Sequence, residues 1–236
     1  MKLLGKKLVA SSPLPGAELF TPELRKLVRE RRGLRRADRY TLLAAAAAFP
    51  LVEALETPPP GDDTALLTVT AFGPHATVFA TLDDILDYPE DEILPTKFSH
   101  SVHNAAASYL CAALNIRGPV FALNGMENGF YEALFFAETL LADGMARAVL
   151  LVGIEEGGLL PGRAPEFAPE RFHADMAEGA LALLLGPEEG PGAYGTLRLA
   201  ATPERPFRKQ AFAFGVGTET LTELAAAGPE STVVWP

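Results

Sequence analysis

The stretch from residue 117 to residue 134 constrains the fold of this chain more than any other part of the sequence. An apolar run predicts a strand at residues 120–123, and a helical pattern begins at Glu127 after a turn that contains Gly125. A side chain in such a turn meets the unpaired N–H groups and the positive dipole end of the helix. The sequence therefore predicts a strand that turns directly into a helix, and we call this unit the elbow.

Strand and helix patterns alternate along the whole chain, which predicts an α/β fold. Strands are predicted at residues 2–10, 66–71, 120–123, 146–153, 179–185, 194–201 and 231–235. Helices are predicted at residues 21–31, 38–56, 76–88, 105–114, 127–141 and 218–227. Thr21 and Asp38 are the expected N-caps of the first two helices, and Pro50 is expected to kink or break the second near Ala48.

Two further expectations concern the second half of the chain. Residues 157–172 are rich in Gly, Pro and Arg without periodicity, so a loop is predicted there. The strands at residues 179–185 and 194–201 are separated by a segment rich in Gly, Pro and Glu. They are therefore expected to form an antiparallel pair with a long turn.

The charge balance disfavours two classes of partner. The chain has 20 Lys and Arg residues against 30 Asp and Glu residues, which gives a formal net charge of −10 at pH 7. A negative field of that size repels the phosphates of nucleic acids and anionic membrane surfaces. The start of the chain lacks the long apolar core of a signal peptide, and no run of 18 apolar residues predicts a membrane span. We therefore expect a cytoplasmic protein with neither a nucleic acid nor a membrane as its partner.

The sequence has no pattern typical of a metal or cofactor site. Cys111 is the only cysteine, which excludes an internal disulfide and a cysteine-rich zinc site. The spacing of His100, His103 and Cys111 fits no standard zinc pattern, and glycine-rich nucleotide-binding motifs are missing. Cys111 also lies inside a helical pattern, away from the N-terminal amides that lower the pKa of a reactive thiol. We expect no metal, no cofactor and no nucleophilic role for Cys111.

One segment is strongly basic, although the chain as a whole is acidic. It spans residues 25–36, and we call it the basic patch. It contains Arg25, Lys26, Arg29, Arg31, Arg32, Arg35 and Arg36. Two interpretations are open: a solvated helix face, or a docking site for an acidic partner.

The occupant of the elbow also has two interpretations. An elbow between strand and helix suits a nucleophile, but Glu127 is a carboxylate and a poor acyl acceptor compared with a thiolate. The simpler interpretation is an acid at a helix start, where the dipole stabilises its anion without any chemistry. The neighbours that define the elbow are Asn124, Gly125, Met126, Asn128 and Gly129.

Several motifs, in their order along the chain, resemble the N-terminal half of the β-ketoacyl synthases, a family with the thiolase fold. Gly118-Pro119 precede the strand and the elbow, and residues 148–153 read Ala-Val-Leu-Leu-Val-Gly after the following helix. Residues 36–40, Arg-Ala-Asp-Arg-Tyr, resemble the family's early helix. Residues 177–185, Ala-Glu-Gly-Ala-Leu-Ala-Leu-Leu-Leu, resemble one of its strands. Residues 98–107, Phe-Ser-His-Ser-Val-His-Asn-Ala-Ala-Ala, resemble the short ketosynthase-like proteins known as chain length factors, notably those near aryl polyene synthesis.

The resemblance carries expectations about the architecture. It implies a layered, thiolase-like α-β-α half-fold around a mixed five-stranded sheet. It also implies a single domain over residues 1–236, with residues 218–236 resembling the start of a second half that is otherwise missing.

The sequence departs from this family where the family performs chemistry. Counted from Gly118-Pro119, the nucleophilic cysteine of the family falls on Glu127, and Met126, Asn128 and Gly129 replace the small residues around it. The two catalytic histidines and the lysine of the family come from its second half, and no histidine follows His173 in this chain. The resemblance therefore implies that acyl transfer to cysteine and decarboxylative condensation are both lost.

Two classes of function follow from these residues. The first is a non-catalytic subunit of the chain length factor type, which pairs with an active ketosynthase in fatty acid, polyene or polyketide synthesis. In the family, the strand after Gly-Pro pairs with its counterpart across the dimer, so the docking edge is expected at Val120, Phe121, Ala122 and Leu123. The basic patch is a candidate site for an acyl carrier protein.

The second class is a protein that acts by itself. It is either a homodimer that binds an acyl group, or an acyl-thioester hydrolase or transferase with Glu127 or His103 as the base. His100, His103 and Asn104 are the residues expected to line a pocket.

Overall fold

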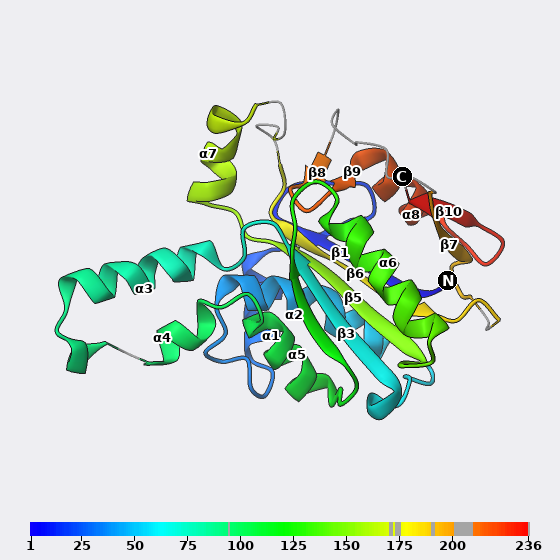
Figure 1. The fold of residues 1–236 in the computed structure, drawn as a ribbon, viewed down its shortest axis with the longest axis horizontal. Helices are drawn as coiled ribbons and strands as arrows, with labels where there is room; N and C mark the ends of the chain where they lie inside the picture. Colours follow the sequence, from blue (N-terminus) through cyan, green and yellow to red (C-terminus); the bar gives the residue numbers. More distant parts are fainter. Residues whose placement is uncertain (94, 170–171, 173–175, 190–191, 201–209, 236) are drawn as a thin grey trace.

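The computed structural model describes residues 1–93, 95–169, 172, 176–189, 192–200 and 210–235. They form three layers, with one mixed sheet between two layers of helices (Figure 1). Its strands are β1 (Lys2–Ala10), β2 (Ala17–Leu19), β3 (Thr64–Thr70), β4 (Val120–Asn124), β5 (Ala148–Glu155), β6 (Gly179–Gly186), β7 (Thr196–Leu199) and β10 (Thr232–Trp235). The predicted α/β class and the mixed sheet are confirmed.

The strand order is β10-β7-β1-β6-β5-β3-β4, and β2 pairs with β1. Strands β4, β3 and β5 are parallel, whereas β6 runs antiparallel to both β5 and β1. The sheet has eight strands in the described part of the chain, so the expected count of five is wrong. The part of the sheet from β1 to β4, both included, has five strands, and β2, β7 and β10 add to the sheet at or beyond β1.

Helices cover both faces of the sheet because its central strands are apolar on both sides. All seven residues of β3 are buried. Leu66 belongs to the core that contains residues of α2 (Arg39–Glu53) and α5 (Ala105–Leu114), whereas Leu67 belongs to the core that contains residues of α6 (Gly129–Ala142) and α8 (Thr218–Ala226). Successive residues of one strand therefore belong to two separate cores, as the two-residue period requires.

The expected N-caps of the first two helices are confirmed. The Thr21 hydroxyl accepts from the Leu24 N–H at 3.2 Å at the start of α1 (Pro22–Arg29). The Asp38 carboxylate accepts from the Thr41 N–H at 2.9 Å at the start of α2. The expected break near Ala48 is wrong, because α2 continues through Pro50 to Glu53. Eleven residues of this helix are buried, so tertiary packing outweighs the lost hydrogen bond.

Two further predictions fail. Residues 157–172 are not all loop, because α7 (Leu159–Phe167) forms within them; Pro161 lies in its first turn, where no N–H partner is needed. Strand β7 does not pair with β6. It pairs in parallel with β10 and touches β1 at one position, because β1 and β5 already occupy both edges of β6.

One helical hairpin extends away from the body of the molecule (Figure 1). It consists of α3 (His75–Asp87), a short turn of 3₁₀ helix at Glu90–Glu92 and α4 (Pro95–His100). We call residues 75–100 the arm. In the described residues, no helix is long and apolar enough to cross a membrane.

Candidate functional site

The elbow joins β4 to α6 through a four-residue turn. Glu127 occupies this turn in the left-handed region with a φ of 58°, which costs a residue with a side chain about 1–2 kcal/mol. Helix α6 begins at Gly129, two residues after the predicted start. Glu127 is half-buried and lies in the turn itself, so it is not an acid of the first helical turn.

A second hairpin fixes this turn from the other side. It is formed by β8 (Gln210–Phe212) and β9 (Val216–Gly217). The Glu127 N–H donates to the Ala213 carbonyl at 3.0 Å, and the Phe130 N–H donates to the Phe214 carbonyl at 2.8 Å. Gly215 has a φ of 96°, and a Cβ atom there would lie 1.7 Å from the Glu127 carbonyl oxygen. A glycine is therefore required for the hairpin to approach the elbow.

The other elbow residues differ in exposure. Asn124 and Met126 are exposed, Gly125 and Asn128 are half-buried, and Gly129 is buried. The Gly125 N–H donates to the Thr70 carbonyl at 3.0 Å, which ties the turn to the end of β3. The elbow is thus held by hydrogen bonds from two directions.

The three residues expected to line a pocket have separate surroundings. The His100 Nε2 atom lies 2.7 Å from the Tyr109 hydroxyl, and the two rings meet edge to face. His103 is exposed and lies over Gly73, where a Cβ atom would be 2.6 Å from its ring. Asn104 is exposed and precedes α5 without a side-chain capping bond.

Strand β4 forms one edge of the sheet. It pairs with β3 alone in the described part of the chain. Val120 is 42% exposed and Phe121 36% exposed; Ala122 is also exposed, and Leu123 is half-buried. The Phe121 ring packs edge to face on Phe136 of α6, with a centroid distance of 4.7 Å. An open edge of this kind, with apolar side chains, is prone to pair with another strand.

The hydrogen bonds at both ends of β4 indicate which of its backbone groups face the open side. The Leu66 N–H donates to the Pro119 carbonyl at 2.9 Å, and the Gly125 N–H donates to the Thr70 carbonyl at 3.0 Å. Because backbone groups alternate in direction along a strand, odd-numbered residues point toward β3. The N–H of Ala122 therefore faces the open edge.

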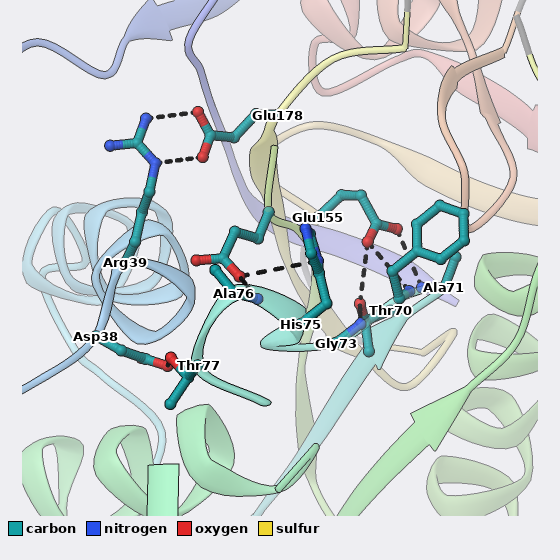
Figure 2. A network of polar contacts seen from close by, with 12 residues as sticks. Asp38, Arg39, Thr70, Ala71, Gly73, His75, Ala76, Thr77, Glu155 and Glu178 are labelled. Atoms are coloured by element: carbon teal, nitrogen blue, oxygen red, sulfur yellow. Dashed lines mark hydrogen bonds and ion pairs between the residues drawn. The ribbon is translucent and has the colours of Figure 1, made fainter. Parts of the chain in front are cut away.

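A buried polar network at the ends of β3 and β5 was missed by the sequence analysis (Figure 2). The Glu155 carboxyl accepts from the N–H groups of Ala71 and Phe72 at 3.0 and 3.2 Å. The Glu156 carboxyl accepts from the Ala76 N–H at 3.2 Å. These two side chains hold the backbone that leads from β3 into the arm. The available signal was a pair of adjacent glutamates directly after an apolar strand pattern.

The same network contains a histidine and an ion pair. His75 is 2% exposed, and its Nδ1 atom lies 3.9 Å from Glu156 Oε2. Neither ring nitrogen of His75 has a hydrogen-bond partner among the described residues. Figure 2 shows Arg39 facing Glu178, and their Nη2 and Oε2 atoms lie 2.5 Å apart.

Burial dominates the protonation of this network. It raises the pKa of Glu155 to about 8 and that of Glu156 to about 7, although backbone N–H groups act against it. Burial also lowers the pKa of His75. For Glu178, the hydrogen bonds from Arg39 and Ser11 outweigh burial and lower its pKa. Near neutral pH, Glu155 therefore retains its proton.

Comparison with protein families gives one clear match. The family described as "Beta-ketoacyl synthase, N-terminal domain" matches residues 30–211, which is more than half of the chain. No curated protein matches the chain.

Several solved structures share the fold at low sequence identity. "The ishigamide ketosynthase/chain length factor" is 17% identical, with a TM-score of 0.65, over 81% of this chain and 64% of that one. The chain thus spans less than two thirds of that relative's length. The ketosynthase (ApeO) in complex with its chain length factor (ApeC) from Xenorhabdus doucetiae is 22% identical, with a TM-score of 0.54, over 79% of each chain.

A third structure bears on the fold of nearly the whole chain. It is AntDE:AntF, a type II PKS acyl carrier protein in complex with its ketosynthase bound to the hexaketide. It is 10% identical, with a TM-score of 0.64, over 99% of this chain and 83% of that one.

Proposed function

Because this chain belongs to the β-ketoacyl synthase family, we propose that it is a non-catalytic subunit of the chain length factor type that pairs with an active ketosynthase. The observation that carries the proposal is the combination of an open edge at β4 with a carboxylate at the elbow. The proposal treats the chain as one domain, in which residues 218–236 correspond to the start of a second half.

The chemistry of the elbow supports a non-catalytic role. Glu127 stands where the family resemblance places the nucleophilic thiol, and a carboxylate cannot form a thioester. The single thiol of the chain, Cys111, lies on α5 and is half-buried, and burial raises its pKa. A thiol in that environment is a weak nucleophile.

The edge strand supports a ketosynthase as the partner. Val120 and Phe121 expose apolar surface along β4, and Met126 of the elbow and Phe135 of α6 are 44% and 58% exposed. Surface of this kind is stabilised by pairing with another strand and by covering the adjacent apolar side chains. A ketosynthase subunit with a matching edge would do both.

The basic patch supports a second, acidic partner, an acyl carrier protein. In the described residues, ion pairs engage only Lys26 and Arg31 of this patch, with Glu30 and Glu53. The remaining arginines of the patch are available to an acidic surface, which they would attract at low ionic strength.

Co-expression with the β-ketoacyl synthase encoded nearest to this gene tests the pairing. We expect the two chains to co-elute in size exclusion with equal stoichiometry. A chain that elutes separately at micromolar concentration of both proteins would contradict the proposal.

One observation favours a second candidate, an acyl-thioester hydrolase or transferase. Glu127 has a left-handed backbone, and such strain accumulates at functional sites. The assay is turnover of acyl thioesters by the wild type and by Glu127→Gln. Under the subunit proposal, neither form shows turnover above the uncatalysed rate. Turnover that disappears in Glu127→Gln would instead establish the enzyme.

A further inference from the structure

The tip of the arm combines exposed apolar side chains with acidic ones. Leu82, Ile85 and Leu86 lie on one face of α3, at the spacing of one helical turn, and are 48%, 51% and 82% exposed. Residues 82–93 also contain six carboxylates and no basic residue. An apolar stripe with an acidic border fits a partner surface that is apolar in the middle and basic at its rim.

The chain itself has a surface of this chemistry. A groove of about 560 Å³ lies between the basic patch and α5, and its lining includes Arg32, Leu34, Tyr109, Ala112 and Ala113. Its lining is mostly apolar, and Arg32 is the one charged residue among the residues that line it.

A second arginine of the basic patch also acts at this groove. The charge of Arg36 lowers the pKa of Tyr109, against the larger opposite effects of burial and of Asp38. Arg36 is exposed and does not line the groove, but it adds a second positive charge close enough to act on Tyr109. We call this surface the basic groove.

The basic groove lies at the root of the arm. His100, the last residue of α4, meets the hydroxyl of Tyr109, which lines the groove. Helix α3 has 13 residues and is about 20 Å long. Figure 1 shows it carrying the tip of the arm away from α1 and α5. In the described residues, no ion pair joins residues 82–93 to the basic patch.

We propose that two copies of this chain associate by docking the arm tip of each copy on the basic groove of the other. When two arms lie antiparallel, each tip reaches the root of the opposite arm. One two-fold axis then satisfies both contacts at once, so the assembly closes as a dimer instead of growing into a filament. This association is independent of strand β4, and it would compete with any other acidic partner of the basic patch.

Two charge-reversal variants test the contact in light-scattering measurements on the purified chain alone. The groove variant is Arg32→Glu with Arg36→Glu, and the tip variant is Asp87→Arg with Glu90→Arg. Each variant alone places like charges opposite each other at the substituted positions of both contacts. The dissociation constant of its dimer is therefore expected to be at least 10-fold higher than that of the wild type. The same effect is expected for the wild type in high salt, because charge attraction between exposed groups is screened.

Mixing the two variants provides the decisive measurement. In the mixed dimer, the substituted positions of one tip face the substituted groove with opposite charge, and the other contact has the wild-type charges. The wild-type dimer affinity is therefore expected to return. The matched control is Arg147→Glu with Arg198→Glu, which reverses two exposed arginines on other parts of the surface and is expected to dimerise like the wild type.

Three outcomes would overturn the proposal: a wild type that stays monomeric near 25.1 kDa, a mixture that fails to dimerise, or a dimer that both variants leave unchanged. A dimer lost only on Ala122→Pro would place the contact at β4 instead. Because no ketosynthase is present, these results are independent of the pairing proposed above.

Discussion

Replacing Ala122 with proline is expected to abolish co-elution with the ketosynthase while leaving the chain folded. The N–H of Ala122 faces the open edge of β4, so proline removes a donor that only a partner strand would use. The hydrogen bonds between β4 and β3 use the odd-numbered residues and remain. The loss of the edge donor and the added proline ring are together expected to lower the affinity for the ketosynthase on the order of 100-fold, which is a change of about 3 kcal/mol in binding free energy.

The matched control for this variant is Ala122→Ser, which keeps the N–H and adds one exposed hydroxyl. It is expected to co-elute like the wild type. Circular dichroism and the thermal midpoint of each variant, measured without the partner, separate a docking defect from a folding defect. Equal co-elution of the proline and serine variants would show that the open edge of β4 is not the docking site.

The stability of the chain is expected to fall as the pH rises from 6.5 to 8, and Glu155 is expected to cause most of this loss. The carboxyl has a pKa of about 8 in the fold, against an ordinary value of 4.5 for a glutamate in water. Between these values the folded chain binds more protons than the unfolded chain, so the free energy of unfolding decreases with increasing pH. The contribution of the protonated Glu155 carboxyl to the free energy of unfolding is fully present below pH 4.5 and is lost as the pH rises through 8.

The window from pH 6.5 upward isolates the carboxyls. Glu156, with a pKa of about 7, acts in the same direction, whereas the lowered pKa of His75 acts in the opposite direction and at lower pH. Over this window, the expected loss from Glu155 is about 2 kcal/mol. Urea unfolding at pH 6.5, 7.3 and 8 measures it.

Two variants of Glu155 separate its proton from its hydrogen bonds. Glu155→Gln cannot ionise, so the larger part of the pH dependence should disappear. The N–H groups of Ala71 and Phe72 bind different carboxyl oxygens, so the single amide oxygen of glutamine can replace only one of these two hydrogen bonds. Glu155→Ala leaves both N–H groups unpaired and should lower stability by about 2–4 kcal/mol at every pH. A Glu155→Gln variant with the full wild-type pH dependence would exclude Glu155 as its source.

Helices and strands were predicted correctly where the local sequence pattern and the burial in the fold favour the same structure. Asp38 and Thr21 cap their helices because their side-chain oxygens accept from backbone N–H groups of the first helical turn, which have no partner within the helix. The strand at residues 66–71 is predicted by the alternation of Thr68 and Thr70 with apolar residues, and the strand at residues 146–153 by an apolar run; these correspond to β3 and β5. The prediction at Pro50 failed because the local cost of the proline is outweighed by the packing of α2 against α1, α5 and three strands of the sheet, which no local pattern reveals.

The pairing of β7 could not be predicted for a different reason. A hairpin with β6 is the simplest expectation for two strands that follow each other. However, β6 gains both neighbours from elsewhere in the sequence, one of them the first strand of the chain. Which strands pair with a given strand depends on the whole sheet, so the neighbours of β6 cannot be predicted from the adjacent sequence.

In the candidate site, too, the sequence predicts one part and not the other. The strand, the turn and the unusual occupant Glu127 were all visible in one continuous segment. The network around Glu155 was not, because it unites the ends of β3 and β5 with the start of the arm, segments that are about 80 residues apart. Two adjacent acids after a strand usually mark a solvated loop, and only the structure shows that they are buried.

The contact between Gly215 and the elbow also sets an order of events in folding. The turn at residue 127 is closed by hydrogen bonds to residues 213 and 214, more than 80 positions later. Contacts of such high sequence separation form late. During synthesis, the segment around Glu127 therefore leaves the ribosome long before the residues that fix its backbone, and this part of the molecule acquires its final shape only after most of the chain has been made.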